Sequence, residues 1–265
     1  MIDSDTGATP LSLLEPDEPP AVEIVNAGGS GSVVLVCDHA SNRVPRRLCT
    51  LGLEAAQLSD HIGWDPGAAE VARRLSLHLD APLVLSGYSR LVIDCNRPLH
   101  SVQSIPEQSA GVSIPGNRAL TPEGRAMRTN ELFLPYHGAI DQLLDSRTGR
   151  LSLLLSIHSF TSIFSGISRP WHIGVSYWRK REFADLMRGA LTLHRDIIIG
   201  DNEPYPIEDE TDYTIPVHGE GRGLPSAMIE IRQDSIQTTD AAAAWAARLA
   251  EAYRLIESEA LNLFK

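Results

Sequence analysis

The chain has 265 residues, of which 43% are hydrophobic and 22% charged, and this composition excludes a largely disordered protein. It carries 23 Lys and Arg against 34 Asp and Glu, and the formal net charge of -11 disfavours nucleic acid and anionic membrane surfaces as partners. No apolar run approaches the roughly 20 residues of a transmembrane helix.

The N-terminal part of the chain predicts an arm followed by a folded domain. Residues 1–21 are rich in Pro, Asp, Glu and Thr and too polar to bury much, so we expect a flexible arm. Residues 22–265 contain no internal repeat and no dividing linker and are expected to form a single domain. Its first elements are predicted to be a buried strand, a helix and two short strands, at residues 32–37, 66–79, 82–86 and 90–95.

The second half of the chain continues this alternation after a long loop. Residues 99–116 show no periodicity and are expected to be that loop, and Thr121 predicts the N-cap of the next helix, which Pro135 and Gly138 are expected to bend. Further strands are expected at residues 151–158, 172–178, 196–200 and 226–233, and helices at 181–194 and 245–263. The pattern predicts an α/β fold: a single three-layer domain with a mixed, mostly parallel sheet and helices on both faces.

The cysteines and the first residues indicate the cellular compartment. Cys37, Cys49 and Cys95 are an odd number at irregular positions, which does not fit a disulfide framework. The opening MIDSDTGATP is acidic and polar, whereas a secretory signal is basic and then apolar. We therefore expect a cytoplasmic protein with reduced thiols, present as a monomer or a small homo-oligomer.

Polar residues follow several of the predicted strands. Asp38 and His39, residues 94–97, His158 and Glu230 each stand at or near the end of an apolar run. The carboxyl ends of parallel strands meet at one edge of a sheet, where open α/β folds bind their ligands, so these residues are predicted to share a cleft. The alternative for each residue taken alone is a polar side chain that meets solvent or caps a helix.

Two of these residues are candidate metal ligands. His39 and His158 come from different strands and suit a site with three protein ligands and an open position for water. We expect the third ligand to be Asp65 in HIGWDPGA, although Asp65 is equally suited to capping the helix that follows it. His61 and Asp38 are weaker substitutes. The sequence thus predicts a site for zinc or another divalent metal.

The segment SRLVIDCNRP is a candidate anion-binding element. If it is a strand, Arg90, Asp94 and Asn96 point to one side, and the turn at Pro98 brings Arg97 to the same cleft. Paired guanidinium donors and an amide suit the carboxylate or the carbonyl of an acidic small molecule. The alternative is a structural ion pair of Asp94 with one of the two arginines, and both can hold together.

Glu230 is a candidate general base. It stands in an apolar strand, where a carboxylate is costly unless it is paired or protonated, and Arg232 on the same face is a possible structural partner. As a base it would take a proton from an activated water and return it to a leaving amine. The Gly- and Pro-rich loop 201–225 is a candidate cover for the site, with His218 as a substrate-binding residue, or else a surface excursion.

An ordered set of motifs resembles the N-formylglutamate amidohydrolase family. The motifs are VCDHASNRVP, HIGWDPGA, SRLVIDCNRP, SIHSF, DNEPY and IEIRQD, and they run from about Val34 to Asp234. The resemblance implies an α/β fold akin to the zinc-dependent exopeptidases and hydrolysis of the amide of an N-acyl acidic amino acid. At longer range the sequence is similar to aspartoacylase and the zinc carboxypeptidases.

The resemblance also implies roles for single residues. Those roles are zinc ligand for His39 and His158, polarisation of the scissile carbonyl for Arg90, contact with the substrate carboxylate for Asn96 and Arg97, and base for Glu230. One departure is Asn42, since the aspartoacylase and carboxypeptidase pattern has Glu three residues after the first His. Asn is a poor ligand, which leaves Asp65 as the substitute.

The predicted function is therefore a metal-dependent hydrolase. A metal-activated water is expected to cleave the linear amide of an N-formyl or other small N-acyl amino acid, with an anionic N-formylglutamate-like molecule as substrate. The alternative, supported by Asn42, is a non-catalytic binding protein for an acidic metabolite that retains a degraded metal site.

Overall fold

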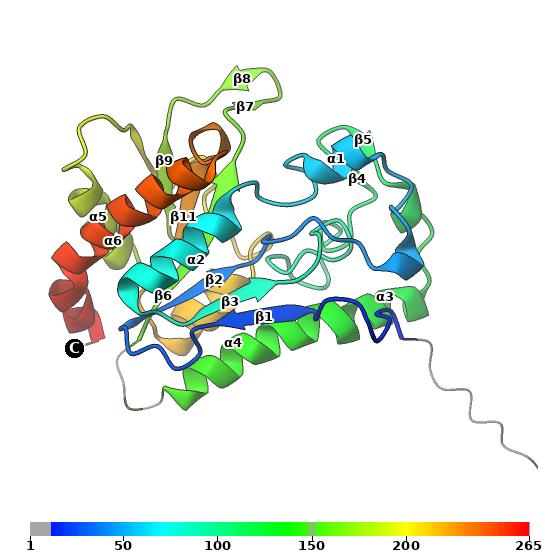
Figure 1. Ribbon diagram of the computed structural model, residues 1–265, viewed down its shortest axis with the longest axis horizontal. Helices are drawn as coiled ribbons and strands as arrows, with labels where there is room; N and C mark the ends of the chain where they lie inside the picture. The colour runs from blue at the N-terminus through cyan, green and yellow to red at the C-terminus, as the bar shows by residue number, and fades with distance from the viewer. Residues whose placement is uncertain (1–11, 148, 150–151, 265) are drawn as a thin grey trace, which may run out of the picture.

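A seven-stranded mixed sheet forms the centre of the computed structural model, which describes residues 12–147, 149 and 152–264 (Figure 1). The strands follow one another across the sheet in the order β1-β3-β2-β6-β11-β9-β10. Their bounds in chain order are Val22–Val25 for β1, Val33–Cys37 for β2, Leu83–Ser86 for β3, Leu153–Phe160 for β6, Ile173–Ser176 for β9, Ile199–Asp201 for β10 and Ser226–Arg232 for β11.

The four central strands are parallel. β3, β2, β6 and β11 pair in parallel, β9 runs antiparallel to β11 with β10 parallel to it, and β1 runs antiparallel to β3. This arrangement confirms the predicted mixed, mostly parallel sheet of a single α/β domain. Because the central strands point the same way, the residues that follow β2 and those at the ends of β6 and β11 lie along one edge.

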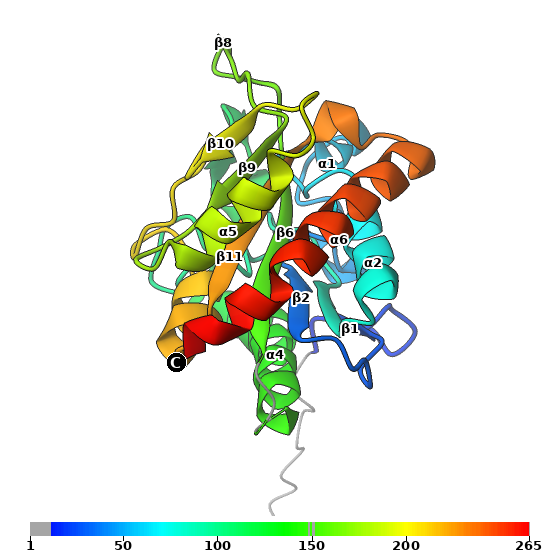
Figure 2. The ribbon, with the colours of Figure 1, turned by 90° about the vertical axis from the view of Figure 1, so that its left-hand side faces the viewer.

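Helices cover both faces of the sheet (Figures 1 and 2). Alternate residues of β2 face opposite sides, which explains why its whole run is apolar: Val33 and Leu35 pack in the core under α2, α5 and α6, and Val34 and Val36 pack in the core with α4. These helices span Ala68–Leu79 for α2, Leu134–Ser146 for α4, Glu182–Leu191 for α5 and Thr239–Leu261 for α6.

The loops that project beyond the sheet carry shorter elements. They are a short helix, α1 at Ala55–Ser59, and two hairpins, β4 and β5 at Gln108–Ser109 and Val112–Ser113, and β7 and β8 at Ile163–Phe164 and Ile167–Ser168. Among the described residues no helix is long and apolar enough to cross a membrane.

The helix after Thr121 has the predicted cap and an interruption before Pro135. The Thr121 hydroxyl accepts a hydrogen bond from the N–H of Gly124 at 3.1 Å and begins α3, Pro122–Arg128. A π-helical turn, Thr129–Phe133, then joins α3 to α4. Pro135 has no N–H to donate to the carbonyl four residues earlier, and a π-helical turn accommodates such a break in the helical hydrogen bonds.

The strand predicted at 90–95 is wrong. This segment consists of turns, with the N–H of Val92 donating to Ser89 at 2.9 Å and the N–H of Asp94 donating to Ser104 at 2.8 Å. Its apolar residues are buried all the same, because Leu91 and Ile93 belong to a second core cluster that lies off the sheet. Burial of an irregular segment and burial of a strand give the same apolar run in a sequence.

The predicted N-terminal arm falls partly outside the described residues, which begin at residue 12. In the described part, Leu13 is only 1% exposed and lies in the second core cluster. The N–H groups of Leu13 and Leu14 both donate to the carboxylate of Glu131, at 2.6 Å and 3.1 Å. Residues 12–21 therefore pack on the domain despite their polar composition.

Arg128 holds the irregular segment 90–97 in place. Its side chain is 1% exposed, and it donates to the carbonyl of Val92 at 2.9 Å and to Asn117 at 2.6 Å. Burial lowers the pKa of Arg128 to about 10. We expect Arg128→Met to lower the free energy of unfolding by about 2 kcal/mol, because it leaves these buried acceptors without a donor.

Urea denaturation followed by circular dichroism measures this loss. The matched control is Arg125→Met on the exposed side of the same helix, which should change stability by less than about 0.5 kcal/mol. Equal stabilities of the two variants would contradict the role given to Arg128.

Candidate active site

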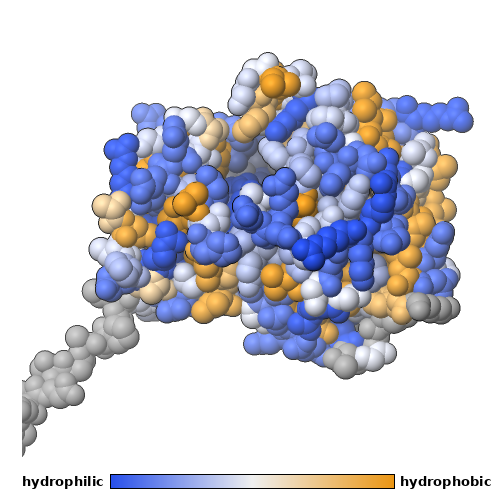
Figure 3. Space-filling model, turned by 180° about the vertical axis from the view of Figure 1, so that it is seen from behind, coloured by the Kyte–Doolittle hydropathy of each residue, from blue (hydrophilic) through white to orange (hydrophobic). Residues whose placement is uncertain are grey.

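A cavity of about 660 Å³ lies at the carboxyl-end edge of the parallel strands. Its floor includes His158 from β6 and Glu230 from β11, and its walls come from loops that include residues 61–65, 90–97 and 205–212. Figure 3 shows this side of the molecule, hollowed beneath the projecting β7–β8 hairpin. Segments far apart in the sequence thus meet at one site, as the strand-end residues predict.

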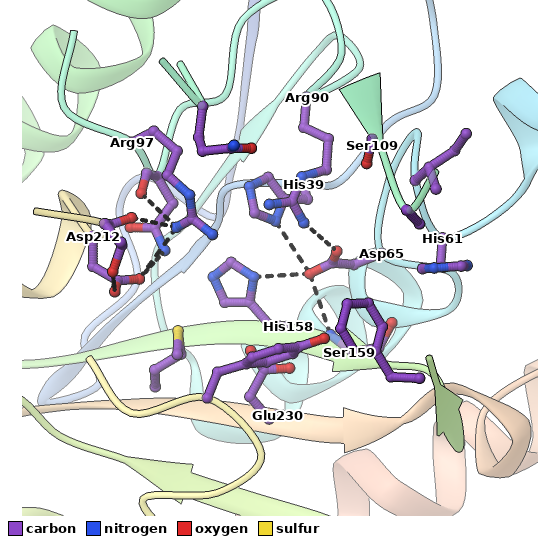
Figure 4. Close-up of a pocket in the computed structure, with 18 of the residues that line it drawn as sticks. His39, His61, Asp65, Arg90, Arg97, Ser109, His158, Ser159, Asp212 and Glu230 are labelled. Carbon is purple, nitrogen blue, oxygen red and sulfur yellow. Dashed lines mark hydrogen bonds and ion pairs between the residues drawn. The ribbon is translucent and has the colours of Figure 1, made fainter. Parts of the chain in front are cut away.

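Two histidines and an aspartate converge in this cavity (Figure 4). His39 follows β2, His158 belongs to β6, and Asp65 lies in the loop before α2. Asp65 Oδ2 is 3.3 Å from His39 Nδ1 and 2.8 Å from His158 Nδ1, and one ligand atom from each residue lies within 4.8 Å of the others. All three residues are buried. The alternative role for Asp65 is not seen, because the N-cap of α2 is Gly67 and no side chain caps this helix.

A second carboxylate lies behind each imidazole. His39 Nε2 is 2.7 Å from Asp94 Oδ1, and His158 Nε2 is 2.8 Å from Asp38 Oδ2. A carboxylate at Nε2 holds the proton on that nitrogen and leaves the Nδ1 lone pair free for a metal. Both rings therefore present the same ligand atom toward Asp65.

The negative charges of the carboxylates in this cluster favour protonated, positively charged histidines. Burial opposes protonation of His158, but the hydrogen bonds to Asp38 and Asp65 outweigh it and raise its pKa well above the usual value. Burial opposes ionisation of Asp65, but the two histidines outweigh it and lower the pKa of that carboxyl. A dication bound at the same nitrogens would replace these protons, so the donor set of two imidazoles and a carboxylate fits a divalent metal.

Asp38 has a role that the sequence did not reveal. In addition to His158, it accepts hydrogen bonds from the hydroxyls of Tyr136 at 2.9 Å, Thr214 at 2.6 Å and Ser156 at 2.9 Å. Asp38 was a weaker substitute for the third ligand, but these donors fix it behind His158 instead. Only its position next to His39 at the end of an apolar run signalled it.

Arg90 lies in the cavity and is paired with Asp94. Its Nε and Nη2 donate to Asp94 Oδ2 at 3.0 Å and 2.7 Å, and its Nη1 is 3.5 Å from Asp65 Oδ1. The same Asp94 holds His39, so one carboxylate orients a candidate ligand and the candidate carbonyl-binding arginine. Arg90 thus both pairs with Asp94 and lines the cleft.

Asn96 and Arg97 also line the cavity. The Asn96 side chain donates to Asp212 at 3.1 Å and accepts from the N–H groups of Tyr213 and Thr214, so its amide is occupied in holding the 211–214 loop. Arg97 donates from Nη1 to the carbonyls of Asn96 and Thr211 and lies 3.4 Å from Asp212. Figure 4 shows its guanidinium between Asp212 and the histidines.

His218 does not lie in the cavity. It is 1% exposed and belongs to a π-helical turn, Ile215–Gly219, that packs against β6 and β11. Its ring stacks on His137, with the two bonded at 2.8 Å, and its other nitrogen is 3.1 Å from Asp141. The prediction of a substrate-binding His218 depends on its Gly-rich surroundings, of which Gly219 packs against Ser226, with 2.3 Å between the ideal Cβ position and Ser226 Oγ.

Glu230 lines the cavity and stands beside His158 in the β6–β11 pairing. Its Oε2 is buried and has no hydrogen-bond partner among the described residues. Burial raises its pKa to about 7. The alternative of Arg232 as a structural partner is not seen, because the Arg232 guanidinium donates to Asp234 at 2.8 Å. A buried carboxylate with a free oxygen in a cavity is suited to accepting a proton.

The chain thus has an α/β fold with a polar cleft, lined by histidines, carboxylates and arginines, at the ends of its parallel strands. It belongs to the N-formylglutamate amidohydrolase family, whose model matches residues 31–237. This match confirms the resemblance carried by the motifs.

Two solved structures are similar to the chain. A gene product from Agrobacterium tumefaciens is 38% identical, with a TM-score of 0.90 over 93% of this chain and 98% of that one. An N-formylglutamate amidohydrolase from Ralstonia eutropha JMP134 is 16% identical, with a TM-score of 0.68 over 91% of this chain and 98% of that one, and shares the fold. Among curated protein sequences no match was found.

The geometry predicts how single substitutions change metal binding. After chelation and dialysis, the wild-type protein should take up a single zinc ion per chain. Asp65→Ala should abolish this uptake because it removes a ligand, and Asp94→Asn should weaken it roughly 10- to 100-fold because it releases His39. Calorimetric titration and elemental analysis measure both effects.

Glu230→Gln is the control, since Glu230 is not among the three clustered ligands. It should bind zinc as the wild type does. Undiminished binding by Asp65→Ala would show that the ion lies elsewhere.

Proposed function

We propose that the protein is a metal-dependent amidohydrolase that cleaves the amide of an N-formyl or other small N-acyl amino acid, with an N-formylglutamate-like molecule as substrate. One observation carries this proposal: His39, Asp65, His158 and the unpartnered carboxylate of Glu230 share one cavity in a chain of this family. The cavity of about 660 Å³ has room for such a molecule.

The metal in this proposal is zinc or a similar divalent ion. His39, Asp65 and His158 would hold it, since imidazole and carboxylate are ligands that zinc accepts in sites with an open position. Such an ion, when bound, supplies Lewis acidity, which favours loss of a proton from water and polarises an amide carbonyl.

Glu230 is the proposed base. Its free Oε2 takes a proton from the attacking water as the oxygen–carbon bond forms, and the same atom returns that proton to the amine nitrogen as the carbon–nitrogen bond breaks. The products are then formate, or another small carboxylate, and the free amino acid.

Arg90 and Arg97 are proposed to contact different negatively charged groups of the reacting substrate. Arg90, whose fork is fixed by Asp94, is placed to stabilise the oxyanion that develops on the carbonyl oxygen. Arg97 faces the cavity from the side of Asp212 and is placed to bind a substrate carboxylate. An anionic substrate is thereby accommodated despite the net charge of -11.

Asn42 had suggested the alternative of a non-catalytic binding protein with a degraded metal site. Asp65 supports the enzyme instead, because it offers the third ligand atom from a different loop. A cytoplasmic location and a monomeric or small homo-oligomeric state complete the proposal, and both rest on the sequence.

Turnover of a panel of substrates tests the proposed function. We expect the zinc-loaded wild type to release amino acids from N-formyl, N-acetyl or N-carbamoyl derivatives, best from acidic ones, and chelation to abolish the activity. Glu230→Gln should lower kcat at least about 1,000-fold, since it removes the proton acceptor while its amide preserves the shape.

The zinc content of Glu230→Gln, measured in parallel, separates loss of the base from loss of the ion. Full activity of the chelated protein, or a wild-type kcat in Glu230→Gln, would contradict the proposed metal-dependent hydrolysis. Binding of both N-formylglutamate and glutamate without any turnover would favour the binding protein.

A further inference from the structure

The segment after β10 is seated closely on the sheet. The carbonyl oxygen of Glu203 lies where a Cβ on Gly174 or Gly200 would be, at 1.7 Å and 2.8 Å from the two ideal positions. Only glycine allows this approach. The Asn202 side chain also accepts a hydrogen bond from the N–H of Tyr177 at 3.0 Å. The backbone that carries Tyr205 is therefore held at a fixed distance from the cavity, although sequence alone left this loop as a possible mobile cover.

The Tyr205 side chain is fixed by a second contact, to Arg169. The Arg169 guanidinium lies over the rings of Tyr205 and Phe164, 4.6 Å and 4.7 Å from their centroids, and its Nη1 donates to Tyr205 Oη at 2.8 Å. In the described part of the chain the side-chain hydrogen bonds of Arg169 go to the Tyr205 hydroxyl and the Thr161 carbonyl and not to a carboxylate. Arg169 Nη1 donates to the carbonyl of Thr161 at 3.4 Å, and the shorter of its two hydrogen bonds is the one to the phenol oxygen.

The O–H of Tyr205 is free to donate a hydrogen bond. Its oxygen already accepts from Arg169, and none of the described residues accepts its O–H. Partial desolvation raises the pKa of Tyr205, the hydrogen bond from Arg169 lowers it, and the charge of Glu230 raises it again; the net direction is upward, which keeps the proton on the oxygen. Tyr205 lines the same cavity as Glu230 and Arg90.

We propose that Tyr205 is a catalytic residue that donates its phenolic O–H to the oxyanion formed on the scissile carbonyl, and that Arg169 is the residue that positions it. This inference rests on the proposed amide hydrolysis. As water adds to the acyl carbon, the carbonyl π electrons move to the oxygen, and the Tyr205 hydrogen bond strengthens with the negative charge. The phenolic proton stays on Tyr205, so the proton balance of the reaction remains with Glu230.

The position of Tyr205 favours the oxyanion over the substrate carboxylate. Tyr205 lines the cavity together with Glu230 and Arg90, which are the groups proposed at the reacting carbon, and the charges of both act on its phenol. Arg97, the proposed carboxylate partner, is engaged instead with Asp212 and Thr211. A donor aimed at charge that develops only in the transition state raises kcat more than it lowers KM.

Kinetics of Tyr205→Phe test the catalytic part, with zinc-loaded protein and N-formyl-L-glutamate. We expect kcat to fall roughly 100-fold with KM changed by less than about 2-fold, and the affinity for the product glutamate to stay unchanged in calorimetry. Tyr88→Phe is the matched control, because the Tyr88 hydroxyl donates to the carbonyl of Pro19 away from the cavity.

Arg169→Met tests the positioning part, because Met keeps an apolar chain between the two rings but removes the donor. We expect kcat to fall roughly 10-fold and the double variant to be no slower than Tyr205→Phe alone, as for two residues acting in one unit. The tyrosinate absorbance that Tyr205→Phe removes should appear at higher pH in the Arg169→Met background, a readout that needs no turnover.

Three results would overturn the inference. A wild-type kcat in Tyr205→Phe, or a raised KM with unchanged kcat, would remove Tyr205 from the transition state while leaving the proposed hydrolysis intact. Additive losses in the double variant would separate Arg169 from Tyr205. Absence of turnover by the wild type on the whole substrate panel would overturn the proposed function, and this inference with it.

Discussion

The site depends on the two carboxylates that hold the histidine rings in place. Asp94 and Asp38 each bind the outer nitrogen of one ring, and this fixes which nitrogen faces the cavity. Asp38 is in turn held by three hydroxyls, and Asp94 by Arg90 and the N–H of Asn96. A buried cluster of this kind is stable only when nearly every polar atom has a partner.

Glu230 differs from the other carboxylates of the site, because its Oε2 has no hydrogen-bond partner among the described residues. The strand that carries it is buried on both faces, and its neighbour across the β6–β11 pairing is His158. Burial raises the pKa of all these carboxyls. At Asp65 and Asp94 the imidazole and guanidinium partners outweigh it and lower the pKa, whereas at Glu230 burial prevails. The same pocket thus contains carboxylates suited to holding a cation and one suited to exchanging a proton.

The sequence allowed most of the sheet and the members of the histidine cluster to be predicted, because both depend on local patterns. Apolar runs identified the strands, and the polar residues at their ends identified the edge where they meet. The strand expected at 90–95 failed because an apolar run reports burial and not hydrogen-bond pairing. The position of His218 could not be predicted because spacing does not show which neighbour a side chain contacts. The hydroxyls around Asp38 could not be predicted because they come from three distant segments.

The order of strands in the sheet has a consequence for how the chain folds during synthesis. β11 is the last strand to be made, yet it lies between β6 and β9. Until it emerges from the ribosome, β6 has an unpaired edge and β9 with β10 has no place to attach, so the nascent chain holds two incomplete halves. Closing a sheet by late insertion of an inner strand requires contacts between residues far apart in sequence, which is the slow kind of folding and the kind that benefits from chaperones.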